Sequence, residues 1–361
     1  MTIGVGAGVG PLLGGFLSDA FGWQAIFAVT AIAAVTVPVG LKVLPVDEER
    51  TGEQLDVLGG LLLAFTIGGA LIAVTEVARS GWQTPLVIGG LISAMVAPLA
   101  LTVRQRMARF PFIPMEFVRN SQLLALGGMS FSVMAAYVAA LVGLPLLLTE
   151  LHGQAPIQVG LTLLPGAILT GILGLTAGRV VDRIGILVPM RIGLPLMLLG
   201  LLGMSTFTDA SPLALSGFMA MLGGGFALVN TPIAAAVSLV VRTQRLASAL
   251  SMNSMLFFIG GSFGAALLIA LTIGSDGASA LNPLHTGAAA GYSDAFLWSG
   301  LFIMFAFGLS FATPSQAREP ARERLTTVQQ RPFGVEWVGD CSIPWTPECS
   351  RVEHAEAQEV S

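Results

Sequence analysis

The sequence has few charged residues. Aspartate, glutamate, lysine and arginine together make up 11% of its 361 residues, whereas a soluble domain carries about 25%. Hydrophobic residues make up 54%, and the mean hydropathy is +0.81. A water-soluble fold cannot bury this much apolar surface, because a globule of this size must present a polar skin. The composition therefore excludes a soluble domain and favours a membrane protein.

Lysine and cysteine are also scarce. Lys42 is the only lysine, and no basic face for nucleic acid is present. Cys341 and Cys349 are the only cysteines, and both lie close to the C-terminus. Their spacing fits two unpaired thiols in a flexible segment better than a zinc site completed by His354.

Catalytic constellations are missing as well. His152, His285 and His354 lie far apart in the sequence, and no acid–base pair or nucleophile arrangement accompanies them. The sequence therefore argues against an enzyme. No basic segment precedes the first apolar run, as a signal peptide requires. That run, Ile3 to Leu17, is shorter than the roughly 20 residues of a membrane crossing, so we interpret it as a helix whose beginning is missing.

Long apolar runs recur along the chain and predict membrane spans. Backbone groups in hydrocarbon must form their hydrogen bonds within one segment, so these spans are expected to be helices. The sequence thus predicts an all-α polytopic membrane protein with about ten transmembrane helices. They cover residues 1–17, 24–44, 57–76, 85–103, 123–147, 158–177, 189–208, 213–239, 248–273 and 295–312.

The arginines predict the orientation of these spans. If the loops alternate sides, one side holds only Arg79, and the other holds the tail arginines and a larger set: Arg50, Arg104, Arg106, Arg109, Arg119, Arg179, Arg183, Arg242 and Arg245. Lysine and arginine accumulate on the cytoplasmic side of membrane proteins. The C-terminal tail is therefore expected in the cytoplasm, and the protein in the cell inner (plasma) membrane.

A glycine stripe marks the first span. Gly6, Gly10 and Gly14 recur at every fourth position, with Pro11 and Gly15 beside them. A bare helix face of this kind lets a neighbouring helix approach closely, and a proline within the helix bends it. The stripe fits either ordinary close packing or a hinge where two helical bundles rock against each other.

These residues resemble the antiporter motif of the major facilitator superfamily, G-x-x-x-G-P-x-x-G-G, which lies in the fifth span of its exporters. Further segments resemble the fourteen-span drug:proton antiporter branch of that family. They are Phe21 to Phe27, Asp56 before a glycine-rich span, Gly81-Trp82, Pro111 to Asn120, Leu164 to Gly166, Asn282 to Leu284 and Tyr292 to Phe296.

Gly178, Asp182, Arg183 and Gly185 resemble the second-half copy of the family's cytoplasmic loop signature, which implies a cytoplasmic gate. The sequence departs from that signature at residues 186–188 (Ile-Leu-Val), where basic residues are usual. The alternative for Asp182 and Arg183 is a solvated loop, because exposed ion pairs contribute only about 0–1 kcal/mol.

The resemblance implies an incomplete major facilitator fold in which spans five to fourteen are present and the first four are absent. Residues 1–44 are then a two-span remnant of the N-terminal bundle, and residues 45–122 a two-span central insert. Residues 123–312 form the C-terminal six-span bundle, and residues 313–361 a disordered cytoplasmic tail.

No carboxylate lies in the middle of a span, where charges usually mark a proton or ion path. Glu76 and Glu150 lie near outer span ends. Tyr137, Asn230 and Asn253 lie within spans, where they either line a cavity or form helix-to-helix hydrogen bonds. These five residues are the candidates for a cavity or for proton coupling.

The resemblance implies a secondary transporter that exports drugs or other small lipophilic compounds by proton antiport with alternating access. The proton gradient is then the energy source, and no cofactor or metal is expected. The bilayer and the exported compound are the expected partners, and the oligomeric state is left open. The alternative is a truncated membrane fragment that does not transport and has at most a binding or structural role.

Overall fold

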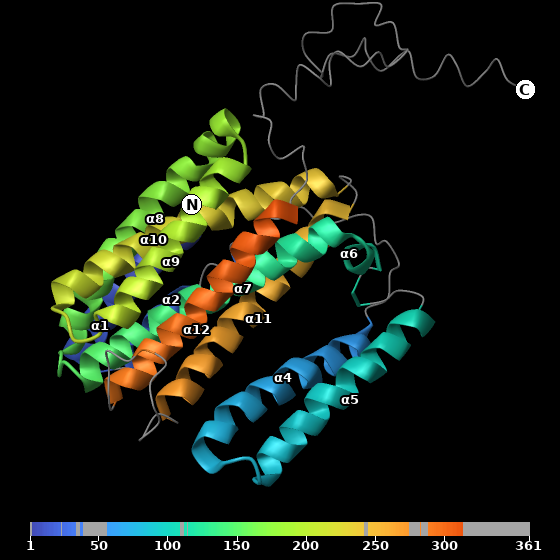
Figure 1. Ribbon diagram of the computed structural model, residues 1–361, viewed down its shortest axis with the longest axis horizontal. Helices are drawn as coiled ribbons and strands as arrows, with labels where there is room; N and C mark the ends of the chain where they lie inside the picture. Colours follow the sequence, from blue (N-terminus) through green and yellow to red (C-terminus); the bar gives the residue numbers. More distant parts are fainter. Residues whose placement is uncertain are drawn as a thin grey trace, which may run out of the picture. The chain divides into compact units, whose positions relative to one another are not determined.

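All regular structure in the described residues is helical (Figure 1). The computed structural model describes residues 2–22, 24–33, 37–38, 56–108, 112–113, 115–241, 245–273, 282 and 288–312. Its helices are α1 (Thr2–Phe21), α2 (Gln24–Ala33), α4 (Val57–Ser80), α5 (Pro85–Met107), α6 (Met115–Arg119), α7 (Ser121–Glu150), α8 (Pro156–Ile184), α9 (Leu187–Thr206), α10 (Pro212–Val240), α11 (Leu246–Ile273) and α12 (Ala288–Leu309), followed by the short 3₁₀ turn η2 (Ser310–Ala312).

Eight described helices are long and apolar enough to cross a membrane: α4, α5 and α7 to α12. Each coincides with one predicted span, which confirms the all-α polytopic fold. The first two predicted spans overlap α1 and α2, which are not among these eight helices, and α2 covers only Gln24–Ala33 of the predicted span 24–44. The predicted end of the second span, residues 39–44, lies outside the described residues. The tail, residues 313–361, also lies outside the described residues, so its disorder stays a prediction. The predicted domain boundaries stay predictions as well.

Local chemistry fixes where several helices begin and end. Asp56 and Asn120 accept backbone N–H groups at the starts of α4 and α7, which replaces hydrogen bonds that a helix start lacks. Proline begins α5, α8 and α10, a position that needs no N–H donor. Gly81 and Gly185 end α4 and α8 with φ of 75° and 81°, a conformation that glycine adopts without steric cost.

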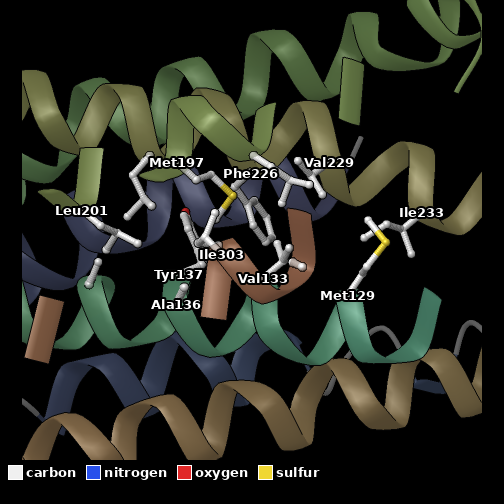
Figure 2. Packing of buried hydrophobic residues seen from close by; sticks show 14 of the residues in the cluster. Met129, Val133, Ala136, Tyr137, Met197, Leu201, Phe226, Val229, Ile233 and Ile303 are labelled. Carbon is white, nitrogen blue, oxygen red and sulfur yellow. The ribbon is translucent and has the colours of Figure 1, made fainter. Parts of the chain in front are cut away.

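The core lies among α7, α9, α10 and α12. Helix α7 packs against α11 and α12, and α10 packs against α8 and α9. Fully buried side chains from these helices interlock (Figure 2), among them Met129, Met197, Leu201 and Val229. Because lipid is as apolar as these side chains, tight packing rather than removal from water holds such helices together.

Glycines bring several helix pairs into backbone contact. A Cβ added at Gly193 of α9 would lie 2.7 Å from the carbonyl oxygen of Gly225 in α10. Cβ atoms added at Gly260 and Gly264 of α11 would collide with the backbone of α7 at Phe131 and Ala135. The two helices therefore approach each other at a distance that only glycine permits.

Helices α4 and α5 form an antiparallel pair (Figure 1). The Ser93 hydroxyl donates to the carbonyl oxygen of Phe65 at 2.8 Å, and Gly69 meets Gly90 backbone to backbone. Helix α4 also packs against α11, and α1 packs against α8. The pair exposes large apolar side chains on its other faces, including Met95 and Leu99, as expected for helices surrounded by lipid.

Candidate functional site

The glycine motif lies on α1, which continues as a helix through Pro11. A Cβ added at Gly15 would lie 2.8 Å from the carbonyl oxygen of Pro156, at the start of α8. A Cβ added at Gly10 or Gly14 would have no atom within 4 Å. The surroundings of Gly6 and Pro11 lie outside the described residues. Packing within this chain thus accounts for Gly15, whereas no described residue packs against the stripe at Gly10 and Gly14.

The signature at residues 178–185 is mostly helix and not loop. Gly178, Asp182 and Arg183 all belong to the last two turns of α8, and the helix stops only at Gly185, whose N–H donates to the Val181 carbonyl at 2.9 Å. Asp182 and Arg183 are exposed, and their side chains make no hydrogen bond or ion pair with another described residue. The charged residues extend the helix beyond its apolar part, and the positive φ of Gly185 ends it.

The departure from the family signature has a structural reason. Ile186 and Leu187 are 1% and 6% exposed and belong to the apolar core of the six-helix bundle, whereas Val188 is exposed. Two of the three positions that usually carry basic residues are therefore packed against the core. Arg191, one helical turn further on, supplies a cation at this end of α9.

The polar candidates within the spans have different surroundings. Tyr137 of α7 is 4% exposed, and its ring stacks on Phe226 of α10 with the ring centroids 4.1 Å apart (Figure 2). Asn253 of α11 is buried and accepts a 2.8 Å hydrogen bond from Ser130 of α7. Asn230 of α10 is half-buried and makes no hydrogen bond within the described residues. The Asn230 amide thus has no partner among the described residues, whereas Asn253 already uses its amide oxygen.

The two carboxylates near span ends also differ. Glu76 of α4 accepts a hydrogen bond at 2.7 Å from Ser80 on its own helix. Glu150, at the end of α7, accepts one at 2.5 Å from the hydroxyl of Tyr292 on α12. Tyr292 is 3% exposed, so a buried phenol fixes this carboxylate. The pairing links residues far apart in sequence, and only the resemblance of the segment from Tyr292 to Phe296 indicated that Tyr292 mattered.

A polar cluster lies at the same end of the bundle. The hydroxyl of Ser293 in α12 donates to the carbonyl of Ser205 in α9 at 2.7 Å. The Asn282 amide donates to the same carbonyl at 3.3 Å and to the Ser293 hydroxyl at 3.1 Å. Asn282 and Ser293 belong to segments that carry the family resemblance, and their contacts connect α9 to α12.

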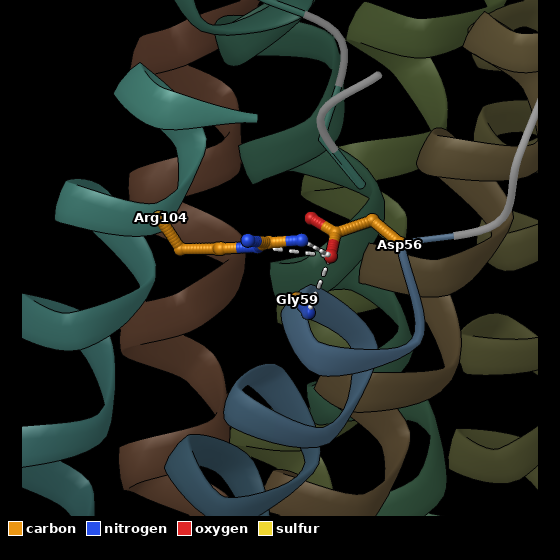
Figure 3. A network of polar contacts seen from close by, with 3 residues as sticks. All are labelled: Asp56, Gly59 and Arg104. Atoms are coloured by element: carbon orange, nitrogen blue, oxygen red, sulfur yellow. Dashed lines mark hydrogen bonds and ion pairs between the residues drawn. The ribbon is translucent and has the colours of Figure 1, made fainter. Parts of the chain in front are cut away.

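An ion pair joins the start of α4 to the last turn of α5 (Figure 3). Asp56 Oδ1 lies 3.2 Å from both Nε and Nη2 of Arg104 and accepts the Gly59 N–H at 3.0 Å. The Asp56 side chain is 2% exposed. Burial alone would raise the pKa of this carboxyl. The hydrogen bond from the Gly59 N–H and the Arg104 guanidinium outweigh that effect and lower the pKa. The residue therefore stays ionised and holds the hairpin closed.

Metal chemistry finds no support in the described part of the chain, where no three histidine, cysteine, aspartate or glutamate residues gather into a metal site. Cys341, Cys349 and His354 lie outside it.

Eight apolar helices in the described part of the chain, six of them packed into one bundle with polar contacts at its ends, define a multi-pass membrane protein. The Major Facilitator Superfamily profile matches residues 1–265. The chain therefore belongs to the major facilitator superfamily, and the resemblance seen in its motifs is confirmed.

Several curated relatives align with this chain. The multidrug resistance protein Stp of Mycobacterium tuberculosis is 30% identical over 277 residues, which cover 73% of this chain and 49% of the relative. The tetracenomycin C resistance and export protein of Streptomyces glaucescens is 29% identical, and the alignment covers 74% of this chain and 52% of that protein. The drug efflux pump JefA of M. tuberculosis is 30% identical, with 74% and 53% covered. The chain thus spans about half the length of these relatives.

Proposed function

We propose that this chain is part of a secondary active transporter that exports small lipophilic or amphipathic compounds in exchange for protons. One observation carries the proposal: no described residue packs against the stripe of bare helix at Gly10 and Gly14, which lies beside a packed six-helix bundle. Such a surface suits a second bundle that closes on it in one state and leaves it in another, as alternating access requires. The names of the relatives, which refer to multidrug resistance and export, support the substrate class.

Within this chain, Glu150 is the carboxylate that we favour for proton coupling. Its hydrogen bond from Tyr292 joins α7 to α12, so a change in its charge acts on two helices. Glu76, by contrast, contacts only Ser80 of its own helix. Asn230, with its free amide near the middle of α10, is the polar group that we favour for contact with the exported compound.

Accumulation of a fluorescent dye in cells that lack their own pumps tests the export function. Cells that express the whole product of this gene should accumulate less dye than cells with an empty vector. A protonophore should abolish the difference, because the proposed energy source is the proton gradient. Unchanged accumulation by a folded, membrane-inserted product would contradict export, and extrusion that persists with the protonophore would contradict proton coupling.

A second candidate is a membrane protein with a binding or structural role and no transport. It is favoured by the coverage of about half of each relative. The same assay separates the two candidates if the 361 residues are expressed alone. Dye extrusion by these residues alone would contradict the second candidate. Extrusion by the longer product only would support the second candidate for these 361 residues.

The proposed orientation places the tail in the cytoplasm of cells whose inner (plasma) membrane holds the protein. It rests on the arginines, nearly all of which fall on one side of the spans. Cys341 and Cys349 report on it directly. A membrane-impermeant thiol reagent should leave both cysteines unlabelled in intact cells and label them after lysis. Labelling in intact cells would reverse the orientation.

A further inference from the structure

Arg191 of α9 is a cation that makes no ion pair with any described residue. Its Cζ lies 4.7 Å from the centre of the Phe311 ring, as in a cation–π contact. Its Nε is buried and has no hydrogen-bond partner, and the side chain makes no ion pair within the described residues. A guanidinium carries five N–H donors, so this group has unused capacity to bind an anion.

The position of Arg191 puts that capacity at a membrane surface. The residue lies four positions after the start of α9, or ~6 Å along the helix axis. Phe311 lies in η2, directly after the end of α12. The apolar side chains next to Arg191 on the helix, Val188 and Ile192, are 44% and 55% exposed, and Phe311 is 62% exposed. This edge of the bundle therefore faces lipid near the level of the head groups.

An anion at that depth would lower the free energy of the arginine considerably. A charged side chain at the edge of the hydrocarbon is costly unless it reaches the interface or a counter-ion. The phosphate of a phospholipid is the anion that is abundant there, and arginine binds phosphate through paired N–H groups.

We propose that Arg191 and Phe311 form a binding site for the phosphate of an anionic phospholipid, in the leaflet that α9 enters. Phe311 holds the guanidinium flat, and the unused N–H groups bind the phosphate oxygens. That this leaflet is the cytoplasmic one rests on the orientation proposed above. The site itself depends on neither that orientation nor export, and its test uses no transport.

Native mass spectrometry of the purified chain tests the site. Protein washed in a neutral detergent is offered equal amounts of phosphatidylglycerol and phosphatidylcholine. The wild type should retain phosphatidylglycerol preferentially, and Arg191→Gln should retain about fivefold less of it, with phosphatidylcholine unchanged. Phe311→Leu, which alters an exposed residue, should fold and show a smaller loss. Arg183→Gln removes the same charge from an exposed arginine and should behave as wild type.

A measurement on the wild type covers the case in which Arg191→Gln does not fold. Phosphatidylglycerol with a photo-reactive head group should attach to the peptides that contain residues 187–192 or 310–312. Attachment elsewhere would overturn the proposal, as would unchanged retention by folded Arg191→Gln or an equal loss in Arg183→Gln. Displacement of phosphatidylglycerol by millimolar inorganic phosphate would assign the site to a free anion, which also contradicts a lipid site.

Discussion

At the scale of single residues, Asp56 joins two helices through one carboxyl group. It caps the start of α4 through Gly59 and pairs with Arg104 in the last turn of α5. The ring of Phe112, in the connection that follows α5, packs against Gly60. The hairpin, its closing ion pair and the chain that leads toward the six-helix bundle therefore meet at this carboxylate.

The lowered pKa of Asp56 makes this contribution dependent on pH. The Gly59 N–H and then Arg104 favour the carboxylate in the folded protein. Its stabilising effect is therefore fully present above the unfolded pKa of about 3.9 and is lost as the pH falls through the lower, folded value. Asp56→Asn keeps a capping side chain but removes the charge. We expect a lower melting temperature than wild type at pH 7 and a difference that shrinks below about pH 4.

Arg104, the partner of Asp56, provides the control for this prediction. Arg104→Gln should lower the melting temperature at pH 7 in the same direction, and adding it to Asp56→Asn should lower it little further, because the two changes remove one interaction. Additive effects, or a difference that stays constant between pH 7 and pH 3, would show that the ion pair is not the cause.

Gly10 and Gly15 lie close together on α1 but should respond differently to a leucine. Gly15→Leu should reduce the yield of folded protein, because the backbone of Pro156 fills the space that the side chain needs. Gly10→Leu should leave the folded yield unchanged, because its Cβ meets open space. The yields follow from fluorescence-detected gel filtration. A loss of folded Gly10→Leu equal to that of Gly15→Leu would place a packing partner against the stripe.

Sequence reasoning reached some of these residues and missed others. Asp56 and Gly185 were singled out through the family resemblance, whereas the cap that Asp56 forms and the left-handed conformation of Gly185 were not predicted. The pairings of Arg104 with Asp56 and of Tyr292 with Glu150 could not be predicted, because they join residues that are 48 and 142 positions apart. Asn253 fits the helix-to-helix hydrogen bond that was one of its two interpretations.

At the scale of helices, close backbone contact between α7 and α11 is the feature most sensitive to small changes. Gly264→Ala adds one methyl group where the backbone of Ala135 leaves no room, and overpacking costs about 1–3 kcal/mol. Gly308→Ala adds the same group on α12, where no atom lies within 4 Å, and alanine favours a helix over glycine by about 1 kcal/mol in peptides.

We therefore expect opposite outcomes from the same substitution. In detergent, Gly264→Ala should melt at a lower temperature than wild type, whereas Gly308→Ala should melt at the same temperature or higher. If Gly264→Ala melts as wild type does, α7 and α11 do not pack through this glycine.

The helices themselves were largely predictable, because a long apolar run in a membrane has few alternatives to a helix. Their ends were not. Helix α8 was expected to end at residue 177 and continues to Ile184, since its polar last turns pass beyond the apolar segment. How the helices pair depends on glycines at helix contacts, whose partners the sequence does not reveal.

At the scale of the whole molecule, the family followed from the order of several weak motifs rather than from any one of them. The profile match over residues 1–265 confirms it. Mechanism is a different matter. The hydrogen bond that the exposed Glu150 accepts from the buried Tyr292 suits a machine that couples protons to a moving interface. So does the stripe at Gly10 and Gly14, against which no described residue packs, and that coupling is the central claim.

Proton movement in inverted membrane vesicles tests this claim most directly. Vesicles that contain the whole gene product are energised to an acidic interior, which a pH-sensitive dye reports. Addition of an exported compound should release protons and restore the dye signal, and Glu150→Gln should suppress the release while the folded yield stays that of wild type. Transport of the compound into these vesicles without any proton release would contradict the account.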